Sequence, residues 1–450
     1  MAKIFVGDIY SRICDDPRAV AAVREMCRAR PDGYRYMPRY RAGHWDGYIS
    51  VMSGMNAFPT GLLDYVVAGL VERGHIVEAP RSLPHVPSIP VHNTMLCGVT
   101  LRDYQMDAVM SLLANGRGVA KMATNAGKTE IMAAMLKVYD AKAVVVVHRK
   151  ELMYQTADRF ERRLGVPVGM IGDGVCQPAI ITVAMVQTLY SRPELLDAFY
   201  DNVVLMADEC HTVSSDQMLS VLNKLPGPYR FGFSGTPLKY TELADMKLIG
   251  ATGPVVVDVT NAELIDDGWS ANPDIELHVV ASVEDRLWSA DYQTAYDEAI
   301  VHNDERNRII ATRAKALSDK VVMILVTRIE HGALLQSAIP GSIFVNGSHP
   351  AELRQATLDQ MRNGNVGVYI ASPIFDEGVD VPGVNALILA GGGKSHIKLL
   401  QRIGRGMRKK PGDNRILIID FIDDTNQYLL DHSDSRVEVY EKEGFNTAIV

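Results

Sequence analysis

Short apolar runs separated by longer amphipathic stretches recur through the chain after residue 95. The runs consist mostly of Val, Ile, Leu, Ala and Met, and they cover 143–147, 202–207, 230–234, 321–326, 342–345, 367–371, 385–390 and 415–420. Strands buried on both faces of a parallel sheet have this nearly continuous apolar pattern, because helices cover both sides of such a sheet. The pattern predicts α/β architecture with two parallel-sheet domains in tandem.

A proline-rich stretch separates these domains from the beginning of the chain. Four prolines fall within 80–90, and each one fixes φ and removes a backbone donor, so neither a helix nor a central strand continues through them. The domains that we expect are a small α+β N-terminal domain over 1–78, a linker over 79–94, a first parallel-sheet domain over 95–252 and a second over 253–450.

Within the N-terminal domain we expect helices over 17–29 and 60–73 and strands around 34–52. The break between the two sheet domains is expected near 249–257, where glycine and proline gather. The C-terminal segment 435–450 is expected to add a strand to the second domain.

The composition is typical of a globular protein without a membrane span. The 450 residues are 47% hydrophobic and 22% charged, and no apolar run approaches the roughly 18 residues of a membrane span. The N-terminus has no secretory pattern, and the five cysteines are scattered without a CxxC pair, which favours free thiols over a zinc or iron–sulfur site. We therefore expect a cytoplasmic protein, in the host cytoplasm if a phage encodes it.

The net charge of −8 hides a local excess of basic residues. Residues 1–92 contain 11 Lys and Arg against 9 Asp and Glu, and eight of the arginines fall between Arg12 and Arg41. Any basic binding surface is therefore expected in the N-terminal region.

A strand, loop and helix pattern at 119–136 carries the first candidate chemistry. An apolar lead-in ends in Gly127-Lys128-Thr129, and an apolar helical period follows. In a phosphate-binding loop, backbone amides face the phosphates, the lysine reaches the β- and γ-phosphate oxygens, and the hydroxyl binds Mg²⁺. Met122 stands where the usual pattern has its first glycine. Alone the motif is a modest signal, since a chance turn before a core helix has the same form.

Two acidic residues at the end of a later apolar run support the phosphate-loop interpretation. Asp208 and Glu209 follow the run at 203–207, and parallel sheets bind ligands at the carboxyl ends of their strands. Asp208 is suited to hold a Mg²⁺ shell, and Glu209 to orient or deprotonate an attacking water. A helix-capping acidic pair is the alternative, which the strand-to-loop position disfavours.

Basic residues recur at three-residue spacing within 401–412, where Arg402, Arg405 and Arg408 would follow one face of a helical turn. A solvated basic face is the ordinary explanation. The catalytic alternative is an arginine finger, in which guanidinium groups from the second sheet stabilise charge on the γ-phosphate.

These motifs together resemble the superfamily 2 helicases of the DExH type. The segments that carry the resemblance are "ATNAGKT" (123–129), "DECH" (208–211), "FSGTP" (233–237), "FDEGVDVPG" (375–383) and "QRIGRGMR" (401–408), in the family's order across 95–425. The resemblance implies two RecA-like domains with ATP and Mg²⁺ between them and one nucleic-acid strand across their tops. Since one chain then contains a complete ATP site, we expect a monomer.

The resemblance also implies roles for single positions. Gln105, in "LRDYQ", matches the glutamine that reads adenine. The implied ATP-binding set is Gln105, Thr124, Asn125, Ala126, Gly127, Lys128, Thr129, Gly378 and Asp380, and Thr129 and Asp208 would hold Mg²⁺. The implied catalytic set is Lys128, Asp208, Glu209, Gln401, Arg405 and Arg408, with the last two as fingers. His211, Ser234 and Thr236 would couple hydrolysis to movement.

Three further segments, 144–155, 183–189 and 325–335, resemble the family's strand-contacting motifs. The resemblance suggests phosphate contacts from Arg149, Gln187, Thr188, Thr327 and Arg328. An ordinary loop role is the alternative for each of these side chains.

The stretch "YRYMPRYRAGHWDGYI" (34–49) lies outside the motor-like region and is both basic and aromatic. In one interpretation its aromatic residues alternate into a small core while the arginines are solvated. In the other, Arg35, Arg39 and Arg41 contact phosphates, and some of Tyr40, His44 and Trp45 stack on exposed bases. Both can hold, because a strand has two faces.

The segments "HWDGYI" (44–49) and "FPTGLLDYVV" (58–67) ahead of such a core resemble phage recombination helicases of the UvsW type. The resemblance implies an ATPase that moves along one DNA strand, 3′ to 5′, and remodels forks and four-way junctions in replication, recombination or repair. Single-stranded and branched DNA are then the expected partners. Alternatives are a translocase on duplex DNA, an RNA helicase, a binding or annealing module without turnover, and a metabolic P-loop kinase.

Overall fold

The chain forms two compact units in the computed structural model, Met1–Val259 (unit 1) and Thr260–Val450 (unit 2). The residues that the structure describes are 1–81, 83, 89–239, 241–281, 285–288, 290–372, 381–395, 399–400, 402–404, 407, 409 and 414–450. Within these ranges no helix is long and apolar enough to cross a bilayer.

Unit 1 contains an eight-stranded sheet in the order β10-β9-β11-β8-β12-β13-β7-β14. Its strands are β7 (Arg117–Met122), β8 (Ala143–Val147), β9 (Gly169–Gly172), β10 (Val175–Gln177), β11 (Ile181–Met185), β12 (Val204–Asp208), β13 (Tyr229–Ser234) and β14 (Val255–Val259). Except for the β9–β10 hairpin, all neighbours pair in parallel. The predicted runs at 143–147, 202–207 and 230–234 are therefore confirmed as strands.

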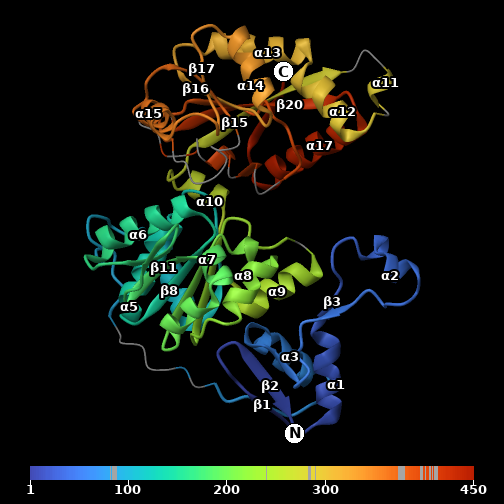
Figure 1. Ribbon diagram of the computed structural model, residues 1–450, viewed down its shortest axis with the longest axis vertical. Helices are drawn as coiled ribbons and strands as arrows, with labels where there is room; N and C mark the ends of the chain where they lie inside the picture. Colours follow the sequence, from blue (N-terminus) through green and yellow to red (C-terminus); the bar gives the residue numbers. More distant parts are fainter. Residues whose placement is uncertain are drawn as a thin grey trace. The chain divides into compact units, whose positions relative to one another are not determined.

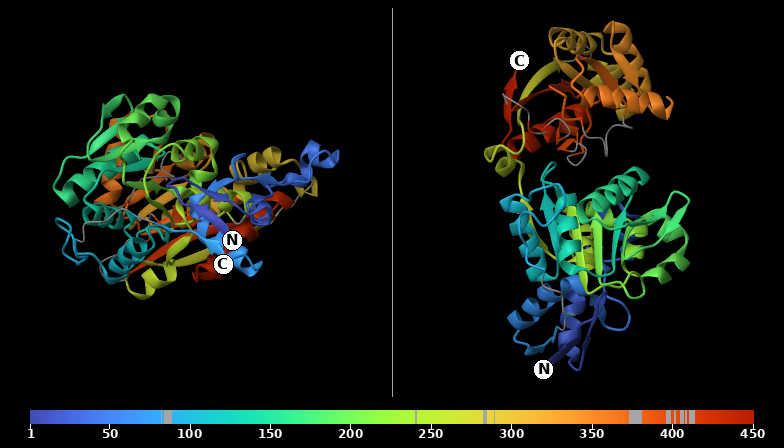
Figure 2. Two further views of the ribbon diagram at one scale, coloured as in Figure 1. Left: turned by 90° about the horizontal axis from the view of Figure 1, so that it is seen from below. Right: turned by 90° about the vertical axis from the view of Figure 1, so that its left-hand side faces the viewer.

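Helices cover this sheet (Figure 2). They are α4 (Asp103–Asn115), α5 (Lys128–Tyr139), α6 (Lys150–Leu164), α7 (Val186–Ser191), α8 (Asp216–Leu222) and α9 (Glu242–Thr252). On one face the alternate strand residues Val144, Val146, Leu205 and Ala207 pack against α8 and α9. The parallel order brings the carboxyl ends of β7, β8, β12 and β13 to one edge of the sheet.

The division between the units falls later than the sequence suggested. Strand β14 begins at Val255, after the expected boundary at 252, and it pairs in parallel with β7 of the first sheet. Gly253 makes the connection possible, because its φ of +133° and its close approach to the backbone of Gly118 leave no room for a Cβ. Residues 253–259 therefore belong to unit 1.

The N-terminal part of unit 1 has its own mixed sheet, in the order β5-β2-β1-β6. The strands are β1 (Ala2–Phe5), β2 (Tyr10–Cys14), β5 (Ala57–Pro59) and β6 (Val77–Glu78), and helices α1 (Pro17–Met26) and α3 (Leu63–Glu72) cover them. Asp16 caps α1 by accepting from the amides of Arg18 and Ala19. The two predicted helices are confirmed as α1 and α3, but α1 ends at Met26 where the prediction ran to 29, and 60–62 form a 3₁₀ turn before α3.

This part packs closely on α9 of the first RecA-like sheet domain. A Cβ on Gly61 would lie 1.9 Å from the carbonyl oxygen of Ile249, and a Cβ on Gly250 would lie 2.8 Å from Pro59. The Arg117 guanidinium, at the start of β7, donates to the carbonyl of Asp8. The N-terminal part therefore packs against the domain of the eight-stranded sheet within unit 1.

The predicted strands around 34–52 are wrong. The segment contains a 3₁₀ turn (Tyr34–Tyr36), the short helix α2 (Pro38–Arg41) and only a two-residue strand, β4 (Ile49–Ser50), which pairs with β3 (Arg28–Ala29). Glycines at 33, 43 and 47 have left-handed φ values, and Pro38 has no amide donor, so a continuous ladder cannot form.

Unit 2 has a seven-stranded sheet in the order β17-β18-β16-β19-β20-β15-β21, with parallel pairing throughout. The strands are β15 (Asn272–Ala281), β16 (Val321–Leu325), β17 (Ile343–Val345), β18 (Gly367–Ala371), β19 (Ala386–Ile388), β20 (Arg415–Asp424) and β21 (Asn446–Ile449). The five predicted runs in this region and the expected C-terminal strand are confirmed. Two RecA-like parallel sheets plus a small α+β part make the predicted fold class correct.

Successive residues of β16 serve opposite faces of this sheet. Val322 and Ile324 pack against α13 (Asp304–Ala316) and α14 (Ile329–Ala338). Met323 and Leu325 join the core under α15 (Ala351–Arg362) and α17 (Gln427–Lys442), whose positions Figure 1 shows. The remaining helices are α10 (Asn261–Asp266), α11 (Asp285–Trp288) and α12 (Tyr292–Tyr296).

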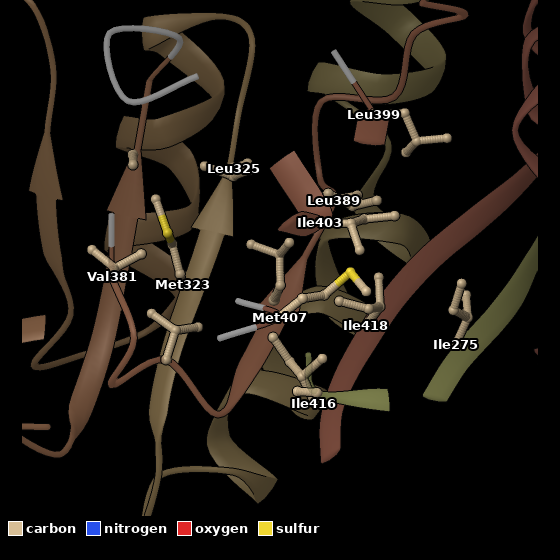
Figure 3. Packing of buried hydrophobic residues seen from close by; sticks show 14 of the residues in the cluster. Ile275, Met323, Leu325, Val381, Leu389, Leu399, Ile403, Met407, Ile416 and Ile418 are labelled. Atoms are coloured by element: carbon tan, nitrogen blue, oxygen red, sulfur yellow. The ribbon is translucent and has the colours of Figure 1, made fainter. Parts of the chain in front are cut away.

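Three apolar residues between 399 and 407 belong to the core of unit 2. Leu399, Ile403 and Met407 are spaced four residues apart, and all three are buried in the core beside Ile416 and Ile418 of β20 (Figure 3).

Candidate ATP site and nucleic-acid-contacting residues

The phosphate-binding loop follows β7 and ends where α5 begins at Lys128. Gly127 has a φ of +80°, and a Cβ there would lie 2.3 Å from the Gln105 side-chain nitrogen, so only glycine fits. Asn125 also has a left-handed φ, +74°. Asparagine is among the few side chains that tolerate this conformation, which accounts for its presence in the loop.

Gln105 holds this loop from α4. Its Nε2 donates to the carbonyl of Ala126 at 2.9 Å, and its Oε1 accepts from the amide of Arg102 at 3.0 Å. The hydroxyl of Tyr104 donates to the same Ala126 carbonyl at 3.0 Å. Gln105 is buried and serves as an anchor of the loop, while its role in adenine recognition stays a prediction.

Lys128 and Glu209 form an ion pair at the edge of the sheet, with 3.6 Å between Nζ and Oε1. Burial disfavours the ammonium, but the negative charges of Glu209 and Asp208 outweigh it and raise the pKa of Lys128. Burial and the Glu209 charge raise the pKa of Asp208. For Glu209, burial is outweighed by Lys128 and His211, which lower its pKa.

A chain of polar contacts leads from Glu209 to the end of β13. His211 Nδ1 lies 3.2 Å from Glu209 Oε2 and 3.2 Å from Ser234 Oγ. Ser234 Oγ donates to Glu209 Oε2 at 3.4 Å and accepts from the amide of Thr236 at 3.2 Å. Of the three residues expected to couple hydrolysis to movement, His211 and Ser234 therefore contact the predicted catalytic carboxylate directly, and Thr236 is linked to it through Ser234.

Sequence reasoning missed two residues of this site. The charge of His148, directly after β8, acts on both carboxylates: it partly opposes the rise in the pKa of Asp208 and adds to the lowering of the pKa of Glu209. Tyr104 binds the loop beside Gln105. The signal for Tyr104 was its position within "LRDYQ", whereas His148 could be found only from the adjacency of β8 and β12.

Other predicted ATP-site residues have fewer recorded contacts or lie outside the described ranges. Thr124 and Thr129 are half-buried in the loop and at the start of α5. Five predicted site residues fall outside the residues that the structure describes: Gly378, Asp380, Gln401, Arg405 and Arg408.

Two of the predicted strand-contacting segments meet at neighbouring strand ends in unit 1. Arg149 precedes α6 after β8, and Gln187 and Thr188 begin α7 after β11. Because β8 and β11 are neighbours, the Gln187 amide donates to the carbonyl of His148 at 2.8 Å. This contact brings the two segments together.

In unit 2 the predicted strand contacts are engaged with the protein itself. Thr327 Oγ1 donates to the carbonyl of Gly391 at 3.3 Å. Arg328 donates to Gln293 at 2.6 Å and lies 3.7 Å from Asp297. A phosphate contact from Arg328 would compete with these groups of α12 and the turn that follows it.

The N-terminal basic segment 34–49, called the aromatic loop below, is built around arginine–aromatic contacts. The Arg30 guanidinium lies 4.8 Å from the Tyr34 ring and 4.4 Å from the Tyr48 ring, and Tyr34 packs edge-on against Tyr40 at 4.9 Å. None of its aromatic residues belongs to the buried core of the N-terminal part. The core interpretation is therefore wrong.

The side chains of the aromatic loop differ in exposure. Arg35, Arg39 and Arg41 are exposed. Trp45 is half-buried, and its indole nitrogen donates to the carbonyl of Tyr48 at 2.8 Å. Tyr36, which sequence reasoning did not select as a base-stacking residue, is 75% exposed.

Two family descriptions match the chain. Residues 98–239 match "Type III restriction enzyme, res subunit", and residues 301–410 match "Helicase conserved C-terminal domain". The two matches include the phosphate-binding loop, the 208–211 segment and the predicted arginine fingers.

The similar proteins are nucleic-acid motors. The ATP-dependent DNA helicase uvsW of Enterobacteria phage T4 is 26% identical over 94% of both chains. The DNA 3′-5′ translocase XPB2 of Sulfurisphaera tokodaii is 26% identical over 72% of this chain and 82% of its own length.

Solved structures share the fold at low identity. A putative HsdR subunit of a type I restriction enzyme from Vibrio vulnificus gives a TM-score of 0.58 at 19% identity, covering 80% of this chain and 70% of that one. Dbp5 of S. cerevisiae bound to RNA and ADP BeF3 gives 0.56 at 16% identity, covering 78% and 90%.

Proposed function

We propose that this chain, which is a superfamily 2 helicase, uses ATP hydrolysis to move along DNA and remodel branched duplexes. The observation that carries the proposal is the contact chain from Lys128 through Glu209 and His211 to Ser234. It joins a phosphate-binding group, a candidate base and the residues after β13 in one hydrogen-bonded unit. The similarity to the T4 DNA helicase over 94% of both chains supports DNA as the substrate.

The donor set fits MgATP. The Thr129 hydroxyl and the Asp208 carboxylate are hard oxygen ligands, and Lys128 stays cationic beside them. Mg²⁺ in nucleotide-hydrolysing sites is usually held by one or two protein oxygens and by substrate phosphates. When bound, the ion would neutralise phosphate charge during hydrolysis.

Glu209 is suited to be the general base. Lys128 and His211 favour its ionised form, so Oε1 or Oε2 can accept the proton of an attacking water. His211 and Ser234 contact the same carboxylate, and Ser234 accepts a hydrogen bond from the amide of Thr236. A change in the hydrogen bonds of Glu209 during turnover would therefore alter the position of Thr236. We infer that this contact chain transmits the hydrolysis state to the DNA-contacting segments. Contact through backbone phosphates would allow movement over any sequence.

The aromatic loop is proposed as an auxiliary DNA grip. Arg35 and Arg41 lie beside tyrosine rings, with Arg35 Nε donating to the Tyr34 hydroxyl at 3.2 Å and Arg41 5.7 Å from the Tyr36 ring. Arg39 has no recorded side-chain partner in the described part of the chain. An exposed set of guanidinium groups beside an exposed tyrosine suits phosphates and unpaired bases at a branch.

The test is the steady-state ATPase rate without nucleic acid and with single-stranded DNA, duplex, RNA, a fork and a four-way junction. The Lys128→Ala variant gives the background ATPase rate. We expect the largest stimulation by fork and junction, and its loss when Arg35, Arg39 and Arg41 are replaced by alanine together. Replacing the exposed Arg12 and Arg18 is the matched control. Stimulation by RNA alone, or by no nucleic acid, would contradict the proposal.

A translocase that follows duplex DNA without separating strands is the second candidate, favoured by the similarity to XPB2. A strand-displacement assay distinguishes a helicase from such a translocase. A motor that hydrolyses ATP on duplex, displaces a triplex-forming strand and leaves a fork intact would be the translocase. We propose that one chain suffices for activity, which sedimentation of the active species on DNA would test.

A further inference from the structure

A cavity of about 420 Å³ lies in unit 2. Its lining comes from α12, the loop after β19, Leu399 and Arg402 of the segment that follows this loop, and the first half of α17. Thr327, after β16, contributes to the floor. None of the residues predicted to bind ATP lines it.

One wall is a cluster of aromatic rings centred on Tyr292. Its ring centroid lies 5.4 Å from His432, 5.9 Å from Tyr296 and 6.4 Å from Tyr428, which packs edge-on. Tyr428 is 52% exposed. The cluster therefore holds a partly exposed ring in a fixed orientation, which is what base stacking requires.

A second part of the lining is a glycine-rich loop whose carbonyl groups accept hydrogen bonds from other parts of the protein. Arg306 donates to the carbonyl of Ala390 at 2.7 Å, and the Tyr296 hydroxyl to that of Gly391 at 2.7 Å. Two further arginines continue the series: Arg402 donates to Gly392 at 3.4 Å and Arg436 to Gly393 at 3.0 Å.

These bonds leave the amides of the loop as its remaining polar groups. Gly392 and Gly393 have φ values of +55° and +105°, and within the described ranges no recorded bond uses their amides. Successive amides in such a turn form a concave site that attracts anions. Lys394 follows directly, is exposed, and has no recorded carboxylate partner in that same part of the chain.

His432 also lines the cavity, and its ring contacts Tyr292. Burial lowers its pKa, and the charges of Lys394 and Arg436 lower it further. Its Nδ1 is buried without a hydrogen-bond partner in the described structure. Asp420 pairs with Arg436 at 2.8 Å, whereas Lys394 lines the cavity with an exposed side chain that can meet an anionic ligand. The cavity thus combines an aromatic wall, a free hydrogen-bonding nitrogen and an anion-attracting loop.

We propose that this cavity binds one nucleotide unit, with the base on Tyr428 and Tyr292 and the phosphate at Gly392, Gly393 and Lys394. The inference rests on the proposed function, since the unit would be a nucleotide of the DNA strand that crosses unit 2. Free mononucleotide is the other source of the same chemistry. A nucleotide seated here would lie beside the loop that leads into the segment with the predicted arginine fingers.

The test uses the full chain and two probes. A thymidine oligonucleotide with one 4-thiothymidine is photo-cross-linked and the attached residue is mapped, and deoxythymidine monophosphate is titrated as the free nucleotide. A pyrimidine is chosen because Gln105 is expected to direct the ATP site toward adenine. We expect cross-links at Tyr428 or Tyr292.

Single substitutions measure how much each cavity residue contributes to DNA binding. Tyr428→Ala should weaken oligonucleotide binding about fivefold or more, since stacking contributes about 1–3 kcal/mol per base, and Tyr428→Phe should retain it. Lys394→Gln should lower the slope of log Kd against log salt by about one phosphate contact. Tyr200→Ala, at an 80% exposed tyrosine of unit 1, is the matched control and should change neither quantity.

The results distinguish the two sources of the nucleotide, and they distinguish failure of this inference from failure of the proposed function. Cross-linking in the cavity assigns the strand as the source, and binding of the mononucleotide that Lys394→Gln abolishes assigns the free nucleotide. If neither probe reaches the cavity while DNA still stimulates the ATPase, the inference fails and the proposed function stands. If DNA does not stimulate the wild-type ATPase at all, the proposed function itself fails.

Discussion

Lys128 Nζ lies 3.6 Å from Glu209 Oε1, although 81 positions separate the two residues in the chain. Lys128 begins α5 after β7, and Glu209 follows β12, with β13 between the two strands. Glu209 has a φ of +49°, a left-handed conformation that is costly for a side chain other than glycine. Strain of this kind is retained where the surrounding contacts hold a functional group in place.

Glu209→Gln should abolish most ATP turnover while the protein stays folded. The amide preserves the shape of the side chain but cannot accept a proton, and general-base catalysis contributes about 100-fold or more. Steady-state phosphate release with a fork as stimulant is the measurement. Unchanged turnover would assign the base elsewhere and revive the binding-module alternative.

Gln105→Ala should loosen the phosphate-binding loop. The substitution leaves the amide of Arg102 without its Gln105 partner and removes one of two donors to Ala126, a change of about 1–3 kcal/mol in local stability. We expect a higher KM for ATP. Comparing ATP with GTP tests adenine recognition: if Gln105 only anchors the loop, the KM values for both nucleotides will rise by the same factor.

Arg436→Met should destabilise unit 2 strongly. Arg436 is almost fully buried, with Asp420 at 2.8 Å and Asp423 at 4.0 Å. Removing it leaves buried carboxylates with fewer partners, which costs about 3–5 kcal/mol. Thermal unfolding is the measurement. Arg308→Ala, which breaks a solvent-exposed pair with Glu305, is the control and should leave the unfolding temperature unchanged.

His331 should make unit 2 less stable in acid. Its side chain is buried, Nε2 lies 2.8 Å from Asn307 Oδ1, and burial together with the charge of Arg306 lowers its pKa to about 3. Between pH 6.5 and 3 the unfolded chain therefore binds the proton and the folded chain does not, so stability falls as pH decreases through this window.

This single residue should account for roughly 1 kcal/mol of lost stability between pH 7 and pH 5.5. Urea unfolding of the wild type and of His331→Gln at the two pH values isolates the effect. A variant with the same loss as the wild type would show that other groups cause it.

Gly61→Ala should disturb the docking of the N-terminal part on α9. Its Cβ would lie 1.9 Å from the carbonyl oxygen of Ile249, and relief by a backbone shift costs about 1–3 kcal/mol. We expect faster amide hydrogen exchange in α9. Gly54→Ala is the matched control, because a Cβ there meets nothing within 4 Å. Equal exchange in both variants would mean that the contact is not rigid.

The sequence predicted the parallel sheets well because strands buried on both faces need continuous apolar runs, as at 143–147 and 367–371. It was wrong at 34–52, where aromatic residues suggested strands. There the turn glycines and Pro38 overrode the preference of aromatic side chains for strands.

The local chemistry of the site was also present in the sequence. The order of Gly127, Lys128 and Thr129 before a helix, and the position of Asp208 after a strand, follow from short stretches alone. These features depend on neighbours in the chain, whose geometry the backbone fixes.

Only the tertiary structure decided the contacts between strands and helices that are distant in the chain. It placed His148 beside the acidic pair and His211 against Ser234, attached the N-terminal part to α9, and put Tyr292, Lys394 and His432 around one cavity. The physical reason is that strand order sets which carboxyl ends meet, and a run of apolar residues specifies burial without specifying its neighbour.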